Sequence, residues 1–323
     1  MRRLFSHTIG ALLLCAAATH ALSQNFPDRP VRLIVPYGTG GITDIAARIV
    51  APRLGEELGQ QVFVDNRAGG AGMIGFGMAA NAPSDGHTLV LATTALAANP
   101  ILFKSIPYDA RKAFAPVSLV GVVPMVLVVP PSSPAKSISE LIALAKSKSS
   151  EMNYGSAGNG TDNHLTAELF NHLAGIKVTH VPYRGGGQVM TDLIAGRISY
   201  VFATMPTALP FISEGRLKAL ATTGLTRSAA LPDVPTVGET ALPNFSLYAW
   251  LGLFAPAGTP APILAQLNKA TVAALQHADT AQRLRGIGLE TKGGTQAELG
   301  THLDNELKRW ADLARDVKFE VLE

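Results

Sequence analysis

The amino-acid sequence predicts an α/β protein with two domains, each built on an open, mostly parallel sheet that helices cover on both faces. Short runs of β-branched and aliphatic residues alternate along the chain with longer segments of helical character. Several connections between them are short and rich in glycine. The order of strand, glycine loop and helix in the first half recurs in the second, and a late strand is expected to return to the first half. We therefore expect two domains that the chain connects twice.

In the first region, strands and helices alternate with loops of small residues. The predicted elements are strand 31–35, helix 42–58, strand 61–64, a small-residue helix that ends at Ala80, and strand 87–92. Pro52 is expected to kink or interrupt the first helix, because proline lacks the N–H that a helix interior uses. Gly38–Gly41, Ala68–Gly72 and Thr93–Thr94 follow the three strands. Ligands of open α/β sheets bind at the carboxyl ends of strands, so these segments are candidate contacts.

The second region begins with a long apolar run, 117–129, which we interpret as two short strands around Pro124. Ser137, with Glu140 three residues later, predicts a capping box at the start of a helix that ends near Lys148. The further expected elements are strands 153–156, 178–181, 199–203 and 217–222, and helices 162–173 and 189–195.

A strand at 246–254 is expected to return to the first domain, which helices 263–276 and 297–317 then complete. The predicted domains are therefore 24–122 together with 246–323, and 123–245. Two crossing strands would form a hinge, and glycine loops from both domains would face the cleft between them.

The N-terminus has the features of an export signal. Arg2 and Arg3 precede an apolar core at 9–18 that is too short to span a bilayer, and Ala21-Leu22-Ser23 fits a small-x-small cleavage site. Residues 1–23 are thus predicted to be a signal peptide. Cys15 lies inside the apolar run, without the small residues that precede a lipidated cysteine.

Removal of this segment changes the balance of charge and thiols. The formal net charge falls from +3 to +1, so nothing indicates a nucleic-acid partner. Cys15 is the only cysteine, so the mature chain has no disulfide, no thiol nucleophile and no thiolate metal ligand.

The loop after the first strand has the composition of an anion site. Gly38–Gly41 allows close approach to the main chain, and the helix that starts near Thr43–Asp44 offers unpaired N–H groups and the positive end of its dipole. It is neither a Walker loop nor a complete GxGxxG motif. Ala157–Thr161 and Gly185–Gly187 repeat the arrangement. The alternatives are plain glycine turns, with Asp44 and Asp162 acting as helix caps.

Other chemistry has weaker support in the sequence. The six histidines after the signal form no HExxH motif or acidic cluster, so we expect no metal and no cofactor. His164 either contacts a ligand or makes a structural hydrogen bond. An exported hydrolase that uses a serine is the competing class of function. Ser84 and Ser156 have no GxSxG elbow around them, which argues against it.

Several stretches together resemble one family, the periplasmic solute-binding proteins of tripartite tricarboxylate transporters, known as the Bug family. They occur in the family's order along nearly the whole mature chain. The matching stretches are Tyr37–Asp44 with Arg48, Val64–Gly72, Asn153–Thr161 with His164 and Leu165, Val181–Gly186, Thr191–Gly196, and Leu231–Thr236.

The resemblance implies a two-lobed Venus-flytrap fold and a periplasmic, non-enzymatic protein that binds a small organic carboxylate. Partners would be the membrane components of such a transporter or a sensor kinase, and we expect a monomer. Backbone N–H groups of the two loops, with bridging waters, would hold the carboxylate. The loop contacts implied are Tyr37, Gly38, Thr39, Gly40, Gly41, Thr43 and Asp44, with Ser156, Ala157, Gly158 and Thr161. The rest of the predicted site is Thr93, Thr94, His164, Tyr183, Ala203 and Thr204.

The chain departs from the family pattern in three places. Ala95–Pro100 lacks a hydroxyl and an imidazole that many relatives carry, Ala203 replaces an acidic residue, and the loop at Gly38–Gly40 is poorer in proline. The far edge of the cleft is therefore expected to be apolar, which argues against ligands with an ammonium group.

Overall fold

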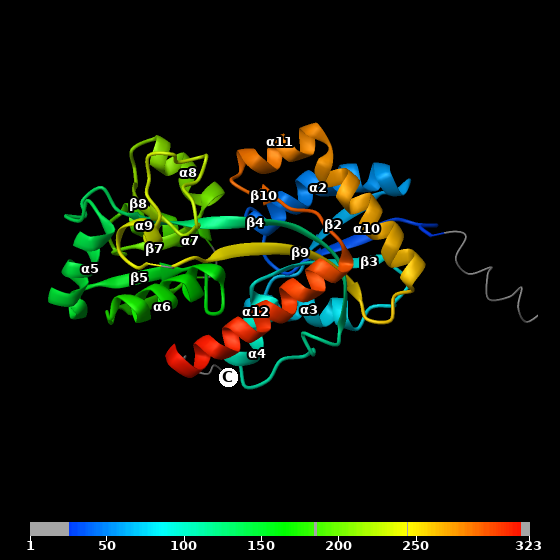
Figure 1. Ribbon diagram of the computed structural model, residues 1–323, viewed down its shortest axis with the longest axis horizontal. Coiled ribbons are helices and arrows are strands. Elements are labelled where there is room, and N and C mark those ends of the chain that lie inside the picture. The colour runs from blue at the N-terminus through cyan, green and yellow to red at the C-terminus, as the bar shows by residue number, and fades with distance from the viewer. Residues whose placement is uncertain (1–25, 184–185, 244, 318–323) are drawn as a thin grey trace, which may run out of the picture.

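The computed structural model describes residues 26–183, 186–243 and 245–317. The predicted signal peptide and its Cys15 lie outside these residues, as do Arg184 and Gly185. Figure 1 shows two lobes joined by the long strands β4 (Phe114–Val129) and β9 (Tyr248–Pro256). None of the helices in the described ranges combines the length and the apolar composition of a membrane span.

The sheet of the first lobe is mixed. β1 (Val31–Val35) lies between β2 (Val62–Asn66) and β3 (Thr88–Thr93), and these three strands are parallel. β3 then pairs antiparallel with β9, β9 with β4, and β4 with the short β10 (Glu290–Thr291). The expectation of a mostly parallel sheet is wrong here, because the returning strand β9 runs antiparallel to both of its neighbours, β3 and β4, and β10 runs antiparallel to β4.

The second lobe repeats this plan. β5 (Asn153–Ser156) is parallel to β6 (Thr179–Pro182), and a parallel bridge from Tyr154 to Tyr200 joins β5 to the start of β7 (Val201–Thr204). β7 and β8 (Lys218–Thr222) pair antiparallel with the second half of β4. In each lobe, a set of three parallel strands thus pairs at one edge with a crossing strand, which is β9 in the first lobe and β4 in the second. This arrangement confirms the repeat predicted from the sequence.

β4 is one continuous strand, so the prediction of two short strands around Pro124 is wrong. Pro124 pairs with Tyr248 of β9, and the next residue, Met125, pairs with Thr204 of β7. The proline therefore lies where the strand changes partners between the lobes, a position at which a missing N–H disturbs the ladder least.

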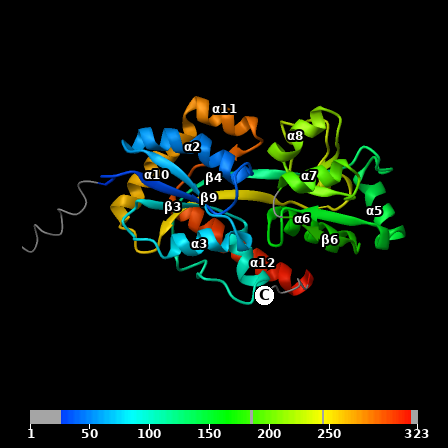
Figure 2. The same cartoon turned by 180° about the vertical axis from the view of Figure 1, so that it is seen from behind.

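Helices cover both faces of the first-lobe sheet, with α2, α10 and α11 on one side and α3, α4 and α12 on the other (Figures 1 and 2). The helices are α2 (Ile42–Leu58), α3 (Met73–Ala80), α4 (Ala95–Leu102), α5 (Ile138–Ser147), α6 (Asp162–Ala174), α7 (Gly186–Ile194), α8 (Met205–Ser213), α9 (Val237–Thr240), α10 (Ala261–Gln276), α11 (Ala278–Gly286) and α12 (Gln296–Val317). Short 3₁₀ turns occur at Gly70–Gly72 and Ser149–Glu151.

Two local expectations about helices need correction. α2 is not interrupted at Pro52, which lies on the exposed side of the helix. Ala46, Ala47 and Leu54 of the same helix are buried against the sheet. At α5 the Ser137 hydroxyl accepts from the Glu140 N–H as predicted, but the Glu140 carboxylate accepts from the Lys136 N–H. The capping box at Ser137 is therefore incomplete.

The C-terminal helix α12 packs against β4 and α4 and reaches α6 of the second lobe. Its buried Glu306 accepts hydrogen bonds through Oε2 from the indole N–H groups of Trp250 on β9 (3.1 Å) and Trp310 (3.2 Å), both of them buried. The bond from Trp250 fixes α12 to the crossing strand β9, and the bond from Trp310, on α12 itself, holds the carboxylate in position.

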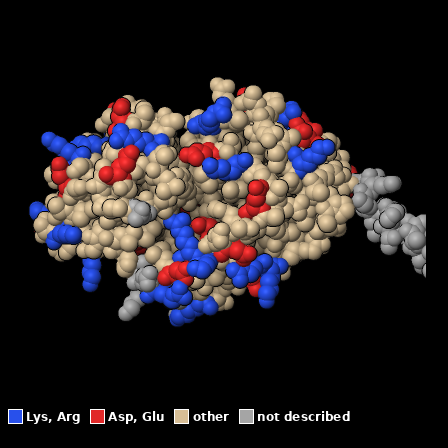
Figure 3. All heavy atoms as spheres, viewed as in Figure 1, with Lys and Arg blue, Asp and Glu red and all other residues tan. Residues whose placement is uncertain are grey.

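Charged side chains of both signs are interspersed on the face in Figure 3, most densely over α12. Many of them are paired, as Lys308 is with Asp312 at 2.7 Å and Arg111 with Asp304 at 2.9 Å. This face shows no extended basic surface of the kind that nucleic acid requires.

The Glu306 network yields a stability prediction. Glu306→Ala leaves two buried indole N–H groups without an acceptor, and unsatisfied donors of this kind cost about 1–3 kcal/mol each. We expect the free energy of unfolding to fall by about 2–4 kcal/mol, measured by urea denaturation with tryptophan fluorescence. Glu306→Gln keeps an acceptor oxygen and is the matched control with a smaller loss. Equal losses in the two variants would contradict the assigned role.

Candidate ligand-binding site

A cavity of about 630 Å³ lies between the lobes at the carboxyl ends of their parallel strands. From the first lobe it is lined by Tyr37, Gly38, Thr39, Gly41, Ile42, Thr43, Ala68–Gly72 and Phe103. From the second lobe it is lined by Ala157, Gly158, Asn159, Thr161, Asp162, Asn163, Gly186, Val189, Met190, Thr204 and Thr207.

Five helices begin at this cavity. The residues before α2, α3, α6 and α8 are Gly41, Gly72, Thr161 and Thr204, and α7 begins at the lining residue Gly186. The two glycines have no side chain to cap a helix, and the side chains of Thr161 and Thr204 make no capping hydrogen bond. The N–H groups of a first helical turn lack partners within the helix and carry the positive end of its dipole. Such an arrangement favours an anion in the cavity.

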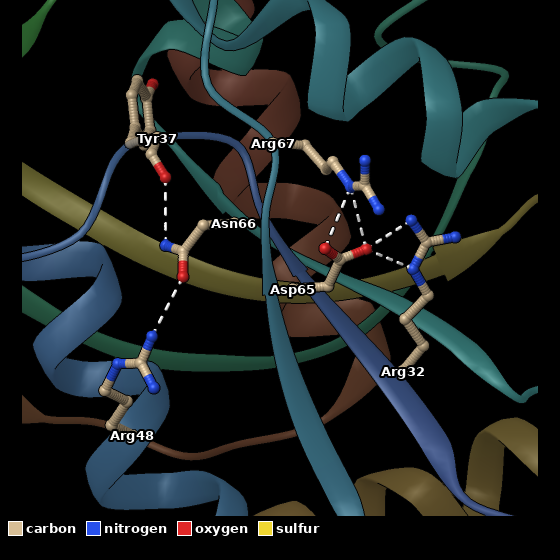
Figure 4. Close-up of polar contacts among 6 residues, drawn as sticks. All are labelled: Arg32, Tyr37, Arg48, Asp65, Asn66 and Arg67. Atoms are coloured by element: carbon tan, nitrogen blue, oxygen red, sulfur yellow. Dashed lines mark hydrogen bonds and ion pairs between the residues drawn. The ribbon is translucent and has the colours of Figure 1, made fainter.

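Asp44 and Asn66 hold the first-lobe loop in place, and Figure 4 shows the contacts of Asn66 with Tyr37 and Arg48. Asp44 Oδ2 accepts from the Gly40 N–H (3.0 Å), and Oδ1 accepts from Arg48 Nε (2.9 Å) and Asn66 Nδ2 (3.0 Å). Asn66 Nδ2 also donates to the Tyr37 carbonyl oxygen at 3.0 Å. Burial opposes ionisation of Asp44, but the bonds from Arg48, Gly40 and Asn66 outweigh it and lower its pKa. Asp44 is thus a buried anion that braces the loop.

The other loop of the first lobe, Ala68–Gly72, also follows a carboxylate that is held by arginines. Asp65, at the end of β2, accepts from Arg32 Nε (2.6 Å) and from Arg67 Nε (2.9 Å), as Figure 4 shows. The chain then turns through Gly69 and Gly72, whose φ angles of 134° and 87° strongly favour glycine. These contacts aim the Ala68–Gly72 loop at the cavity.

Tyr37 lines the cavity, and a hydrogen bond to the end of β3 fixes its hydroxyl. Its hydroxyl shares a 2.8 Å hydrogen bond with the hydroxyl of Thr93, which is buried at the end of β3. Burial, with a smaller contribution from the Asp162 carboxylate, raises the pKa of Tyr37, so the phenol is neutral.

The second-lobe loop is braced by uncharged groups. Thr161 Oγ1 donates to the Gly158 carbonyl oxygen (2.6 Å), and the Gly160 N–H donates to His164 Nδ1 (3.3 Å). The imidazoles of His164 and His180 stack with ring centroids 4.3 Å apart. Burial lowers the pKa of His164 to about 3, with a contribution from His180, and lowers that of His180 to about 4. His164 therefore makes the structural hydrogen bond that the sequence left as one of two alternatives.

Ser156 and His180 form a contact that the sequence did not reveal, with Oγ and Nε2 2.7 Å apart. Ser156 has no exposed surface, lies outside the cavity lining, and is also bonded to both backbone groups of Gly158. A nucleophile must reach its substrate, so this pair serves to hold the loop, and the geometry gives no support to the hydrolase alternative.

The residues predicted for the site fall into two groups. Those on the cavity lining are Tyr37, Gly38, Thr39, Gly41, Thr43, Ala157, Gly158, Thr161 and Thr204. Those outside the lining are Gly40, Asp44, Thr93, Thr94, Ser156, His164, Tyr183 and Ala203. Several of the latter have other partners: Tyr183 donates to Asp192 (2.7 Å), and Ala203 is buried in the pairing of β7 with β4.

Sequence reasoning did not place several lining residues in the site. Asp162 and Asn163 open the helix after a flagged loop, so their position was a usable signal. Phe103, Val189, Met190 and Thr207 come from helices or their ends. Thr207 lies on α8, an element the sequence analysis did not predict.

Comparison with known proteins gives a consistent result. Residues 46–319 match the family described as "Tripartite tricarboxylate transporter family receptor". Protein BugT of Bordetella pertussis is 35% identical over 319 residues, which cover 98% of each chain. An R. palustris protein solved with adipate has a TM-score of 0.86 at 34% identity, over 91% of this chain and 98% of that one. MatC from Rhodopseudomonas palustris with bound malate has a TM-score of 0.83 at 34% identity, over 89% of this chain and 99% of that one.

The stacked histidines make the stability of the fold depend on pH. Their pKa values are lowered on folding, so the unfolded chain binds protons first as the pH falls. Their contribution is complete above about pH 6.5 and is lost as the pH drops toward the folded values of about 4 and 3. We expect the free energy of unfolding to decrease between pH 7.5 and 5 in urea titrations.

A double variant, His164→Asn with His180→Asn, should flatten this pH dependence, because asparagine offers an acceptor without titrating. His172→Gln, at an exposed position on the same helix, is the matched control and should keep the slope of the parent. A parent slope that survives in the double variant would show that other groups are responsible.

Proposed function

The chain belongs to the tripartite tricarboxylate transporter receptor family, and from this premise we propose that its cavity binds a small dicarboxylate through main-chain N–H groups of both lobes. As a member of this family it is a periplasmic solute-binding protein and not an enzyme.

The observation that carries the proposal is the convergence of five helix starts on one cavity. α2 and α3 supply N–H groups from the first lobe, and α6, α7 and α8 supply them from the second. Among the described lining residues, none is a lysine or an arginine. Main-chain donors on two opposing sides suit a ligand with an anionic group at each end.

The space between these donors suits an apolar spacer. Ile42 and Phe103 line the cavity from the first lobe, and Val189 and Met190 line it from the second. A methylene chain buries apolar surface against such side chains. Relatives solved with adipate and with malate support a dicarboxylate of this size class.

Delivery of the ligand requires that the membrane partner distinguish the loaded state. We propose that residues 24–122 with 246–323, and residues 123–245, move as two units about β4 and β9 in a monomeric protein. A ligand bonded to both lobes favours the closed arrangement, because the bonds to the second lobe form only there. The membrane components of a tripartite tricarboxylate transporter would recognise that closed form.

Titration calorimetry with adipate, glutarate, succinate and malate tests the ligand class. We expect at least one of them to bind, and the monocarboxylate butyrate and the diamine putrescine to bind far more weakly.

Gly41→Val tests the site: its φ of −82° suits any residue, and nothing lies within 4 Å of an added Cβ. The side chain would enter the cavity and block about two charge-assisted bonds, at roughly 1.5–3 kcal/mol each, so binding should weaken by about two to four powers of ten.

Gly286→Val is the matched control, because Gly286 is exposed at the end of α11 and an added Cβ there also meets nothing. Gly158 is unsuitable for this purpose, since its φ of 128° would strain any side chain. If Gly41→Val folds and binds the ligand as tightly as the parent, the first-lobe loop does not hold the anion.

A further inference from the structure

Asp162 is the feature of the cavity that an anion site does not explain. It is the first residue of α6 and the only residue with a charged side chain among the described lining residues. Its Oδ1 atom is buried and has no hydrogen-bond partner. A carboxylate here would face the bound anion directly, and like charges in a buried site repel strongly.

Asp162 is on the second lobe, and the polar and charged groups next to it come from the first lobe. The Thr94 hydroxyl at the start of α4 faces it, although Thr94 Oγ1 likewise makes no hydrogen bond of ordinary geometry. Glu306 on α12 brings a second negative charge, and Arg309 lies beyond it, 3.5 Å from the Glu306 carboxylate. The neutral phenol of Tyr37 faces it from the loop after β1.

The influences on the proton affinity of Asp162 oppose one another, and those that raise it prevail. Burial raises the pKa of Asp162 to about 6, the Glu306 charge raises it further, and the contact with Thr94 offsets part of the increase. His164, two residues along the same helix, is neutral in this range and supplies no positive charge.

We propose that Asp162 selects dicarboxylates by taking up one proton when the ligand binds and by donating it as a hydrogen bond to one ligand carboxylate. This inference rests on the proposed function. The proton comes from the buffer and goes to a carboxylate oxygen of Asp162, and no other bond is made or broken.

The proton resolves two unfavourable features at once. It removes the repulsion between the Asp162 carboxylate and the dianion, and it turns a buried oxygen without a partner into one half of a short, charge-assisted bond. A protonated carboxyl at this position donates a hydrogen bond to a ligand carboxylate and so increases the affinity for ligands that carry a second carboxylate. An ionised Asp162 would instead favour a ligand with a hydroxyl or ammonium donor, and the experiment separates the two.

Titration calorimetry at pH 7.5 in phosphate and in Tris, which differ in ionisation enthalpy, measures the protons bound with the ligand. The probe is the tightest binder among adipate, glutarate, succinate and malate. We expect the parent to take up close to one proton per ligand. Its affinity should rise by up to tenfold for each pH unit between 8.5 and 6.5, because the free carboxyl is mostly ionised in that range.

Asp162→Asn should take up no proton and should bind with an affinity equal to or tighter than that of the parent at pH 7.5, independent of pH. Asp279→Asn, an exposed carboxylate on α11, is the matched control and should behave as the parent does. Glu306→Gln removes the neighbouring charge and should move the pH profile of the affinity to lower pH. This variant keeps the test valid if Asp162→Asn fails to fold.

Two results would overturn the inference while leaving the proposed function intact. One is binding of a dicarboxylate by the parent without proton uptake. The other is a loss of affinity greater than tenfold in Asp162→Asn at both pH 6.5 and pH 8.5, which would identify an ionised Asp162 that accepts from a ligand donor. If none of the four dicarboxylates binds the parent, the proposed function fails and this inference fails with it.

Discussion

The unpaired N–H groups at the first turns of helices are the constraint on which the rest of this structure depends. A helix cannot satisfy these donors itself, and here five helices begin at one cavity without a capping side chain at the four N-caps described. The sheet topology produces this convergence, because the parallel strands of both lobes end at the cavity. In the proposed mode of binding, an anion between the lobes accepts from donors of both, so ligand binding and lobe closure would be one event.

The loops stay in place through side chains that do not line the cavity. In the first lobe the buried carboxylate of Asp44 and the amide of Asn66 fix the main chain from Tyr37 to Gly40. In the second lobe the neutral imidazole of His164 accepts from Gly160. Donors held in position in advance lose little entropy when a ligand arrives. The geometry of the loops thus comes from polar groups outside the cavity lining.

The sequence predicted the elements whose patterns are local and missed those that depend on the folded context. β1 and α2 have their predicted bounds, because an apolar run and a helical period each leave a direct signal. α4 and α8 were missed because each contains a proline and α4 is buried on nearly all sides, which removes the amphipathic period. The continuity of β4 through Pro124 depends on its change of partners, which a sequence does not display.

For the site, glycine loops before helices pointed to the correct region, whereas the role of each residue depended on packing. Asp44 and Asp162 have the same setting in the sequence, near a helix start behind glycines. Asp44 is an anion outside the cavity lining, paired with Arg48 and hydrogen-bonded to Asn66, whereas Asp162 lines the cavity with an oxygen that has no partner. Their difference arises from what the opposite lobe and the neighbouring strands bring to each, so it became visible only in three dimensions.

A crystal structure of the protein with a bound dicarboxylate tests the central claim most directly. We expect a closed cavity in which the ligand carboxylates accept hydrogen bonds from main-chain N–H groups of the Gly38–Gly41 loop and of the Ala157–Thr161 loop. A ligand held mainly by lysine or arginine side chains, or bound to one lobe alone, would contradict it.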